Sequence, residues 1–167
     1  GERTGIIGQG QPDRRADHLS RLASVGIDPA AAQHTQQLAL LQWHDAHLQD
    51  GVFDQGRTLR LMADIRQRSV EQGFPNTRFV TQMEWAVESG TPIDALLEYE
   101  ARANLQPLQT PVVCAYDLTR FRGDTVVDIM RTHPMIIVGG MLQENPFFVP
   151  PDQFLRELHE RAARVTG

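Results

Sequence analysis

Two histidines three residues apart, His44 and His47, are the first group in the sequence whose spacing could do chemistry. On a helix, residues i and i+3 share a face, and two imidazoles there can chelate a metal ion. A complete site needs a third ligand with supporting hydrogen bonds. The soft candidates, Cys114 and His133, lie on separate expected elements. A solvated polar helix is therefore the simpler interpretation, and we expect no metal and no cofactor.

A glycine-rich turn at 8–12 (Gly-Gln-Gly-Gln-Pro) joins an expected strand to an expected helix, which is where α/β folds bind phosphates. Its sequence matches neither the dinucleotide-binding pattern nor the P-loop pattern. All 16 basic residues are arginine, so there is no P-loop lysine, and Asp13 places a negative charge at the helix start. An ordinary tight turn is favoured, with residual nucleotide binding as a third alternative.

The groups that could support catalysis are poorly arranged for it. Glu98 and Glu100 are two residues apart on an expected helix, so their carboxylates point to different faces. Cys114 has no histidine beside it in the sequence, and the lack of lysine excludes a Schiff base. We therefore expect that the protein is not an enzyme.

Other polar and aromatic residues gather where short apolar runs end. Ligands of open α/β sheets bind beyond the carboxyl ends of the strands. Tyr116 and Asp117 end one such run, and His133 and Gly139 flank another. Two tryptophans could form the apolar wall of a pocket there. The expected ligand site consists of Trp43, Trp85, Tyr116, Asp117, Arg120, His133 and Gly139.

Apolar runs alternate with helical patterns along the chain, which is typical of βα units and a largely parallel sheet. The runs predict five strands, at 4–8, 38–41, 78–83, 112–116 and 135–138. Apolar residues at helical spacing predict about five helices, starting near Pro12, Phe53, Thr91, Asp124 and Asp152. The fold class is therefore α/β, with one domain over 1–167 and a five-stranded central sheet flanked by helices.

The overall composition narrows the setting. Sixteen arginines against 21 acidic residues give a net charge of −5, which offers no electrostatic footprint for direct nucleic-acid binding. A single cysteine fits a reducing compartment. No apolar run is long enough to span a bilayer and no leader pattern is present, so we expect a cytoplasmic protein without membrane contact.

The chain resembles the MEDS family, the methanogen/methylotroph DcmR sensory domain. The resemblance rests on four motifs: Val-Val-Cys-Ala-Tyr-Asp at 112–117 with Arg120 and Phe121, Asp-Ile-Met-Arg-Thr-His-Pro at 128–134, Val-Gly-Gly at 138–140, and Asn-Pro-Phe-Phe at 145–148. Weaker support comes from 51–54, 83–86 and 97–100. The similarity extends from about residue 1 to 148, and the family's opening segment is expected to be missing before Gly1.

The resemblance implies a sensor of small hydrocarbon derivatives, with a fold related to RecA and KaiC whose phosphate loop has degenerated. It also implies a regulatory protein partner or a fused output domain, such as a histidine kinase, a DNA-binding regulator or an anti-sigma-factor antagonist. A homodimer is a reasonable expectation for such a domain.

Taken together, the sequence predicts a noncatalytic sensory domain of a bacterial signal-transduction or transcription regulator that responds to a small apolar, hydrocarbon-like effector. The alternative is a module that docks a kinase or anti-sigma partner without a small ligand.

Overall fold

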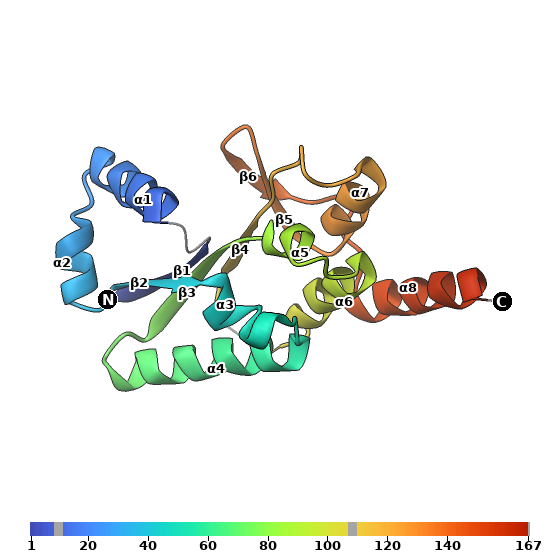
Figure 1. The fold of residues 1–167 in the computed structure, drawn as a ribbon, viewed down its shortest axis with the longest axis horizontal. Coiled ribbons are helices and arrows are strands. Elements are labelled where there is room, and N and C mark those ends of the chain that lie inside the picture. Colours follow the sequence, from blue (N-terminus) through green and yellow to red (C-terminus); the bar gives the residue numbers. More distant parts are fainter. Residues whose placement is uncertain (9–11, 107–109, 167) are drawn as a thin grey trace. The chain divides into compact units, whose positions relative to one another are not determined.

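The computed structural model describes residues 1–8, 12–106 and 110–166, and the chain divides into two compact units. The first unit comprises residues 1–89 and 108–116, and the second comprises residues 90–107 and 117–167. Figure 1 shows the elements of both. Each unit is described by itself below, and the assignment of one domain to the whole chain stays a prediction.

The first unit is built on a parallel four-stranded sheet with the strand order β2-β1-β3-β4. Its strands are β1 (Glu2–Gly8), β2 (Leu38–Gln42), β3 (Asn76–Gln82) and β4 (Val112–Ala115). The α/β class and the first four predicted strands are therefore confirmed. β1 pairs with β2 and β3 on its two sides, with Gly5 opposite Ala39 on one side and Phe79 on the other.

Helices connect the strands of this sheet. The connection from β1 to β2 contains α1 (Pro12–Ser24) and α2 (Pro29–His34), and the connection from β2 to β3 contains α3 (Trp43–Ala46), η1 (Gln49–Gly51) and α4 (Gln55–Glu71). α5 (Trp85–Glu88) follows β3. Figure 1 shows α4 along one side of the sheet and α1 and α2 on the other side. The connection from β1 to β2 and the connection from β2 back across β1 to β3 run in opposite directions along the sheet, so crossovers of the same hand place their helices on opposite sides. The strand order reverses between β1 and β3.

The longest helix, α4, illustrates how local sequence sets these elements. The carboxylate of Asp54 accepts the backbone N–H of Arg57 at 2.8 Å and so caps the first turn. Met62 and Ile65 then face the core, as the predicted apolar stripe requires. α2 was not predicted: the proline at its first position reads as a turn, but the Asp28 carboxylate caps two N–H groups there.

The second unit consists of three helices and a hairpin. Its elements are α6 (Ile93–Ala103), α7 (Gly123–Arg131), β5 (Met135–Val138), β6 (Met141–Glu144) and α8 (Pro151–Thr166). α6 packs against both α7 and α8. The Arg131 side chain on α7 forms ion pairs with Asp128 and Glu157 and lies 5.3 Å from the ring centroid of Phe154. These contacts tie α7 to α8.

The prediction that 135–138 forms a fifth central parallel strand is wrong. β5 pairs with β6 as an antiparallel hairpin, and the turn between them is Gly139-Gly140, with φ angles of +58° and +79°. Two glycines at positive φ match the twist of a two-residue hairpin loop, which other residues adopt only at a cost. In the sequence, the pair Gly139-Gly140 between the apolar residues 135–138 and Met141-Leu142 is the pattern that predicts a hairpin. Ile137 and Leu142 lie opposite each other and are 57% and 66% exposed.

Two predicted helix starts also differ from the structure. Pro92, not Thr91, occupies the N-cap position of α6, and Arg122 precedes α7 in place of Asp124. The Asp124 carboxylate lies inside the first turn and accepts the N–H of Thr125 at 2.8 Å. The centre of the glycine-rich turn, residues 9–11, for which an ordinary tight turn is favoured, lies outside the described residues. Among the helices of the described ranges, none combines the length and apolar composition needed to cross a bilayer.

We predict that Gly5→Ala destabilises the first unit. An added Cβ would lie 3.0 Å from Cδ1 of Phe79, whose side chain is fully buried on β3 and has little room to move. Overpacking of this kind costs roughly 1–3 kcal/mol. Gly56→Ala on α4 is the matched control, because its Cβ would meet only side-chain ends, Arg60 Nη1 at 3.2 Å and Asp54 Oδ1 at 3.4 Å. Alanine favours the helix by roughly 0.5–1 kcal/mol. Urea unfolding curves measure both, and equal midpoints for Gly5→Ala and the unsubstituted protein would contradict the prediction.

Candidate functional site

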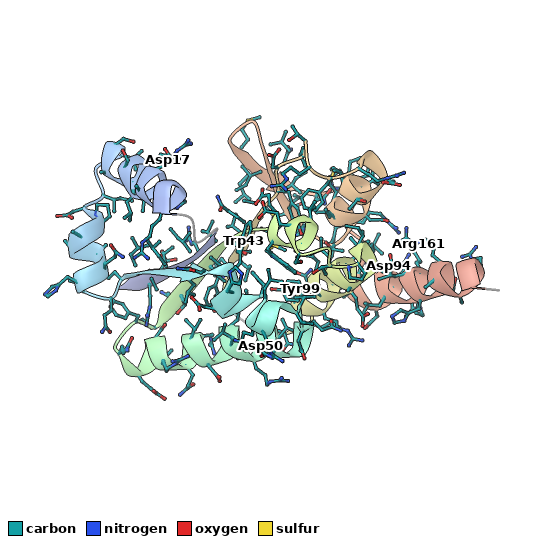
Figure 2. The ribbon with its side chains drawn as sticks, in the orientation of Figure 1. Asp17, Trp43, Asp50, Asp94, Tyr99 and Arg161 are labelled. Atoms are coloured by element: carbon teal, nitrogen blue, oxygen red, sulfur yellow. The ribbon has the colours of Figure 1, made fainter. Side chains whose placement is uncertain are left out.

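Both tryptophans of the chain lie just beyond strands of the parallel sheet. Trp43, labelled in Figure 2, is the first residue of α3 and directly follows β2. Trp85 begins α5 three residues after β3 ends. The carboxyl ends of parallel strands share one edge of a sheet, and ligands of such folds bind there, next to the position where the strand order reverses. Trp85 follows β3, one of the two strands at this reversal.

Two further rings surround Trp85. The imidazole of His47 stacks on the Trp85 ring with centroids 4.6 Å apart and an interplanar angle of 12°. The ring of Phe53 lies at the same centroid distance and is tilted by 40°. Trp43 and His47 are one helical turn apart, and the backbone N–H of His47 donates to the Trp43 carbonyl at 2.7 Å. We call Trp43, His47, Phe53 and Trp85 the aromatic cluster.

The covering segment, residues 43–54, brings His47 and Phe53 onto Trp85. The buried hydroxyl of Thr58 on α4 donates to the carbonyl of Ala46 at 3.3 Å and so holds the start of this segment. His47 Nε2 lies 3.0 Å from the hydroxyl oxygen of Thr81 on β3. Asp50 adopts φ +58° at the turn of η1, a left-handed conformation that aspartate tolerates better than most residues. Side chains of α4 and β3 thus fix the segment over the sheet edge.

The two indole N–H groups are buried donors. Trp43 is 4% exposed and Trp85 is 0% exposed, and neither indole nitrogen has a hydrogen-bond acceptor among the described residues. Buried polar atoms are almost always hydrogen-bonded in folded proteins, because an unmet donor loses its hydration without replacement. The aromatic cluster therefore combines apolar ring faces with two donors that the protein's own described groups do not satisfy.

The predicted site residues divide between the two units. Trp43, Trp85 and Tyr116 belong to the first unit, and Tyr116 directly follows β4 and is half-buried. The structure places the other four residues, Asp117, Arg120, His133 and Gly139, in the second unit.

Three of these four residues, Asp117, Arg120 and Gly139, lie in local turns. The Asp117 carboxylate accepts the N–H and hydroxyl of Thr119, and the exposed Arg120 donates its backbone N–H to the Asp117 carbonyl. Gly139 lies in the β5–β6 turn and not at the end of a central strand.

Sequence reasoning missed His47 and Phe53. The expectation of a solvated polar helix holds for His44, which is exposed, but is wrong for His47, which is 1% exposed. Trp43, Ala46 and His47 are all buried at the spacing i, i+3, i+4, and this apolar stripe was the signal available in the sequence. His44 and His47 therefore do not share one exposed helix face.

His133 forms a buried ion pair within the second unit. Its Nδ1 lies 2.8 Å from the Ile129 carbonyl oxygen at the end of α7, and its Nε2 lies 3.4 Å from a carboxylate oxygen of Glu100 on α6. Both partners only accept hydrogen bonds, so this geometry favours a proton on each ring nitrogen. Burial disfavours the charged ring, but the charge and hydrogen bond of Glu100 and the Ile129 carbonyl outweigh it and raise the pKa of His133.

Two asparagine side chains donate hydrogen bonds to the backbone carbonyls around the end of α7. Asn145 donates its amide N–H groups to the carbonyls of Met130 at 2.6 Å and His133 at 2.8 Å. Asn104, just after α6, donates to the Thr132 carbonyl at 2.6 Å. These bonds satisfy carbonyls that a helix end leaves without intrahelical partners. His133 is therefore part of a structural junction between α6 and α7.

The fold and this site define an α/β protein with a parallel sheet and an aromatic cluster at its carboxyl edge. The sequence model of the MEDS family, described as the methanogen/methylotroph DcmR sensory domain, matches residues 1–134 of the 167. The chain belongs to this family of sensory domains. The match includes the sheet and the aromatic cluster and ends before β5, so the motifs at 138–148 lie outside it. No curated protein matches the chain in sequence.

We predict that the stability of the second unit falls as the pH rises above about 6.5, the ordinary pKa of histidine. The pKa of His133 is raised by folding, so its stabilisation is complete below the unfolded value of about 6.5 and is lost as the pH rises through the folded value. Glu100→Gln removes the charge that raises the pKa and should flatten this dependence. Urea unfolding between about pH 6 and pH 9, with NMR titration of the His133 ring, measures both effects. The same pH slope for both proteins would contradict the assignment.

Proposed function

We propose that this MEDS domain is a noncatalytic sensor that binds a small, largely apolar molecule at the aromatic cluster. The observation that carries the proposal is the pair of buried indole donors, Trp43 and Trp85, at the carboxyl edge of the sheet. Aromatic faces offer a large contact area to an apolar molecule. Tyr116, at the end of β4 in the same unit, is the third residue of the predicted site that fits this location.

The covering segment supplies a means of reporting the ligand. A molecule that contacts Trp85 must share its surface with His47 and Phe53, which belong to residues 43–54. Binding then favours one arrangement of the segment over another, by as much as the ligand's affinity for the two arrangements differs. We propose that a partner protein or a fused output domain of a bacterial regulator reads this change. The relation to RecA and KaiC, with a degenerate phosphate loop, remains part of the proposal.

A second candidate function, docking of a protein partner without a small ligand, is favoured by the β5–β6 hairpin. Six large apolar side chains there and just beyond it are between 43% and 68% exposed: Met135, Ile137, Val138, Met141, Leu142 and Phe147. Exposed apolar patches of this kind on soluble proteins mark interaction surfaces. The hairpin lies outside the family match, so this function would be an addition to the sensory domain.

We predict that small neutral organic molecules stabilise the protein and alter its tryptophan fluorescence. Because both tryptophans lie in the aromatic cluster, their emission reports on this site alone. A ligand at 100 times its dissociation constant stabilises the fold by about 2.7 kcal/mol. This stabilisation raises the melting temperature by roughly 5–10 °C for a protein of this size. The panel should contain apolar molecules, magnesium nucleotides and divalent metals.

The variants locate the site. Trp85→Phe should weaken binding, whereas Val70→Ala, at an exposed position on α4, should leave it unchanged. Loss of binding in His133→Gln with full binding in Trp85→Phe would place the ligand in the second unit and refute the proposed location. A response to nucleotides or metals alone would refute the apolar sensor.

The second candidate makes its own prediction about Ile137 and Leu142, which form an exposed cross-strand pair. If the hairpin is an association surface, the unsubstituted protein shows a concentration-dependent mass in sedimentation, and serine at both positions makes it monomeric. The same substitutions should leave the tryptophan emission unchanged, because that signal comes from the first unit. A monomer at all concentrations before and after substitution would count against self-association through this hairpin.

A further inference from the structure

We propose that the sensed molecule carries a hydrogen-bond acceptor oxygen, as in a ketone, alcohol or ether, and that the indole N–H groups of Trp43 and Trp85 donate to it. This inference rests on the proposed function and deepens it, because it narrows the ligand from any hydrocarbon-like molecule to a neutral oxygenated one. It also gives the two tryptophans a polar role in recognition in addition to apolar contact.

Both indole donors are buried without a hydrogen-bond acceptor among the described residues. An indole nitrogen only donates, so no rotation of its own proton can satisfy it. Both side chains are at least nine-tenths buried, and neither nitrogen has an acceptor among the described groups of the chain. A ligand oxygen that accepts from such a donor relieves an existing penalty. A pure hydrocarbon in the same place leaves the penalty standing, so it should bind roughly tenfold or more weakly for each donor involved.

Both donors lie at the same edge of the parallel sheet. Trp43 follows β2 and Trp85 follows β3, the two strands on either side of β1, so both donors belong to the carboxyl edge of one sheet. His47 connects them, because it lies one turn from Trp43 on the chain and stacks on Trp85. Both donors are thus linked to His47, Trp43 through the backbone and Trp85 through ring stacking.

The surroundings of the donors argue for a neutral ligand. The contacts described for Trp85 are with the ring faces of His47 and Phe53, and His47 in turn meets the hydroxyl oxygen of Thr81. A carboxylate placed against these groups would have to give up its hydration, which costs far more than two neutral N–H donors return. A carbonyl or hydroxyl oxygen on an apolar skeleton satisfies the donors at a much smaller cost of desolvation.

Matched probes test the inference with the unsubstituted protein. Acetone and isobutene, and cyclohexanone and methylenecyclohexane, are pairs of nearly equal shape in which C=CH₂ replaces C=O. We expect each ketone that binds to do so at least about tenfold more tightly than its alkene. The chain has two tryptophans, so its proton–nitrogen correlation spectrum contains two indole signals. The ketone should move at least one indole proton signal downfield, as a new hydrogen bond does, and the alkene should not.

The variants assign the effect to atoms. Trp43→Phe and Trp85→Phe each remove one indole signal and one donor while keeping an aromatic ring. The variant that loses the contributing donor should lose the preference for the ketone and retain the affinity for the alkene. Val70→Ala should keep both. Unfolding curves check that each variant folds, and the probe pairs keep the test decisive if either tryptophan variant does not.

Different outcomes overturn different claims. Equal binding of ketone and alkene would refute this inference and leave the apolar sensor intact. Indole signals that already lie at the position of a hydrogen-bonded N–H and do not move with the ketone would also refute it, because a buried water would then satisfy the donors. No response to either member of any pair, in melting temperature or spectrum, would refute the proposed function itself.

Discussion

Parallel pairing of β1 with a strand on each side is the constraint from which the arrangement of the first unit follows. Because β2 and β3 run in the same direction as β1, the residues that follow them emerge at the same edge of the sheet. These residues are Trp43 and Trp85. The Phe79 ring lies 3.0 Å from where a Cβ on Gly5 would be, so glycine at this position of β1 leaves room for the buried side chain of β3.

The cluster at this edge is unusual because it is both apolar and incompletely hydrogen-bonded. The rings of His47 and Phe53 pack against Trp85, yet the indole donors of Trp43 and Trp85 have no acceptor among the described residues. Buried donors without acceptors lower the free energy of unfolding, and such unfavourable features are found mainly at functional sites. The covering segment, with its left-handed Asp50, is the part of the unit that a ligand would contact first on reaching Trp85.

In the second unit, the end of α7 lies next to the charged pair of His133 and Glu100, and its carbonyls need hydrogen-bond donors. Asn104, Asn145 and the imidazole of His133 satisfy carbonyls at the end of α7, and Glu100 balances the charge of that imidazole. This explains why the segment around His133 is rich in polar residues without requiring a ligand there. The hairpin that follows exposes apolar side chains on both faces, a property that suits contact with another protein.

Much of the fold could be read from the sequence, since periodicity and capping are local properties. The four strands of the sheet and the buried stripe of α4 followed from apolar runs and their spacing, and the resemblance identified the family. By contrast, the pairing partner of 135–138 depends on long-range competition between strands, and its apolar composition suits a central strand as well as a hairpin. The stacking of His47 and Phe53 on Trp85 likewise required the tertiary structure, because it joins residues more than 30 positions apart. The sequence by itself determined which residues could recognise a ligand, and only the tertiary structure decided which of them share a surface, because burial and hydrogen-bond satisfaction depend on neighbours that are distant in the chain.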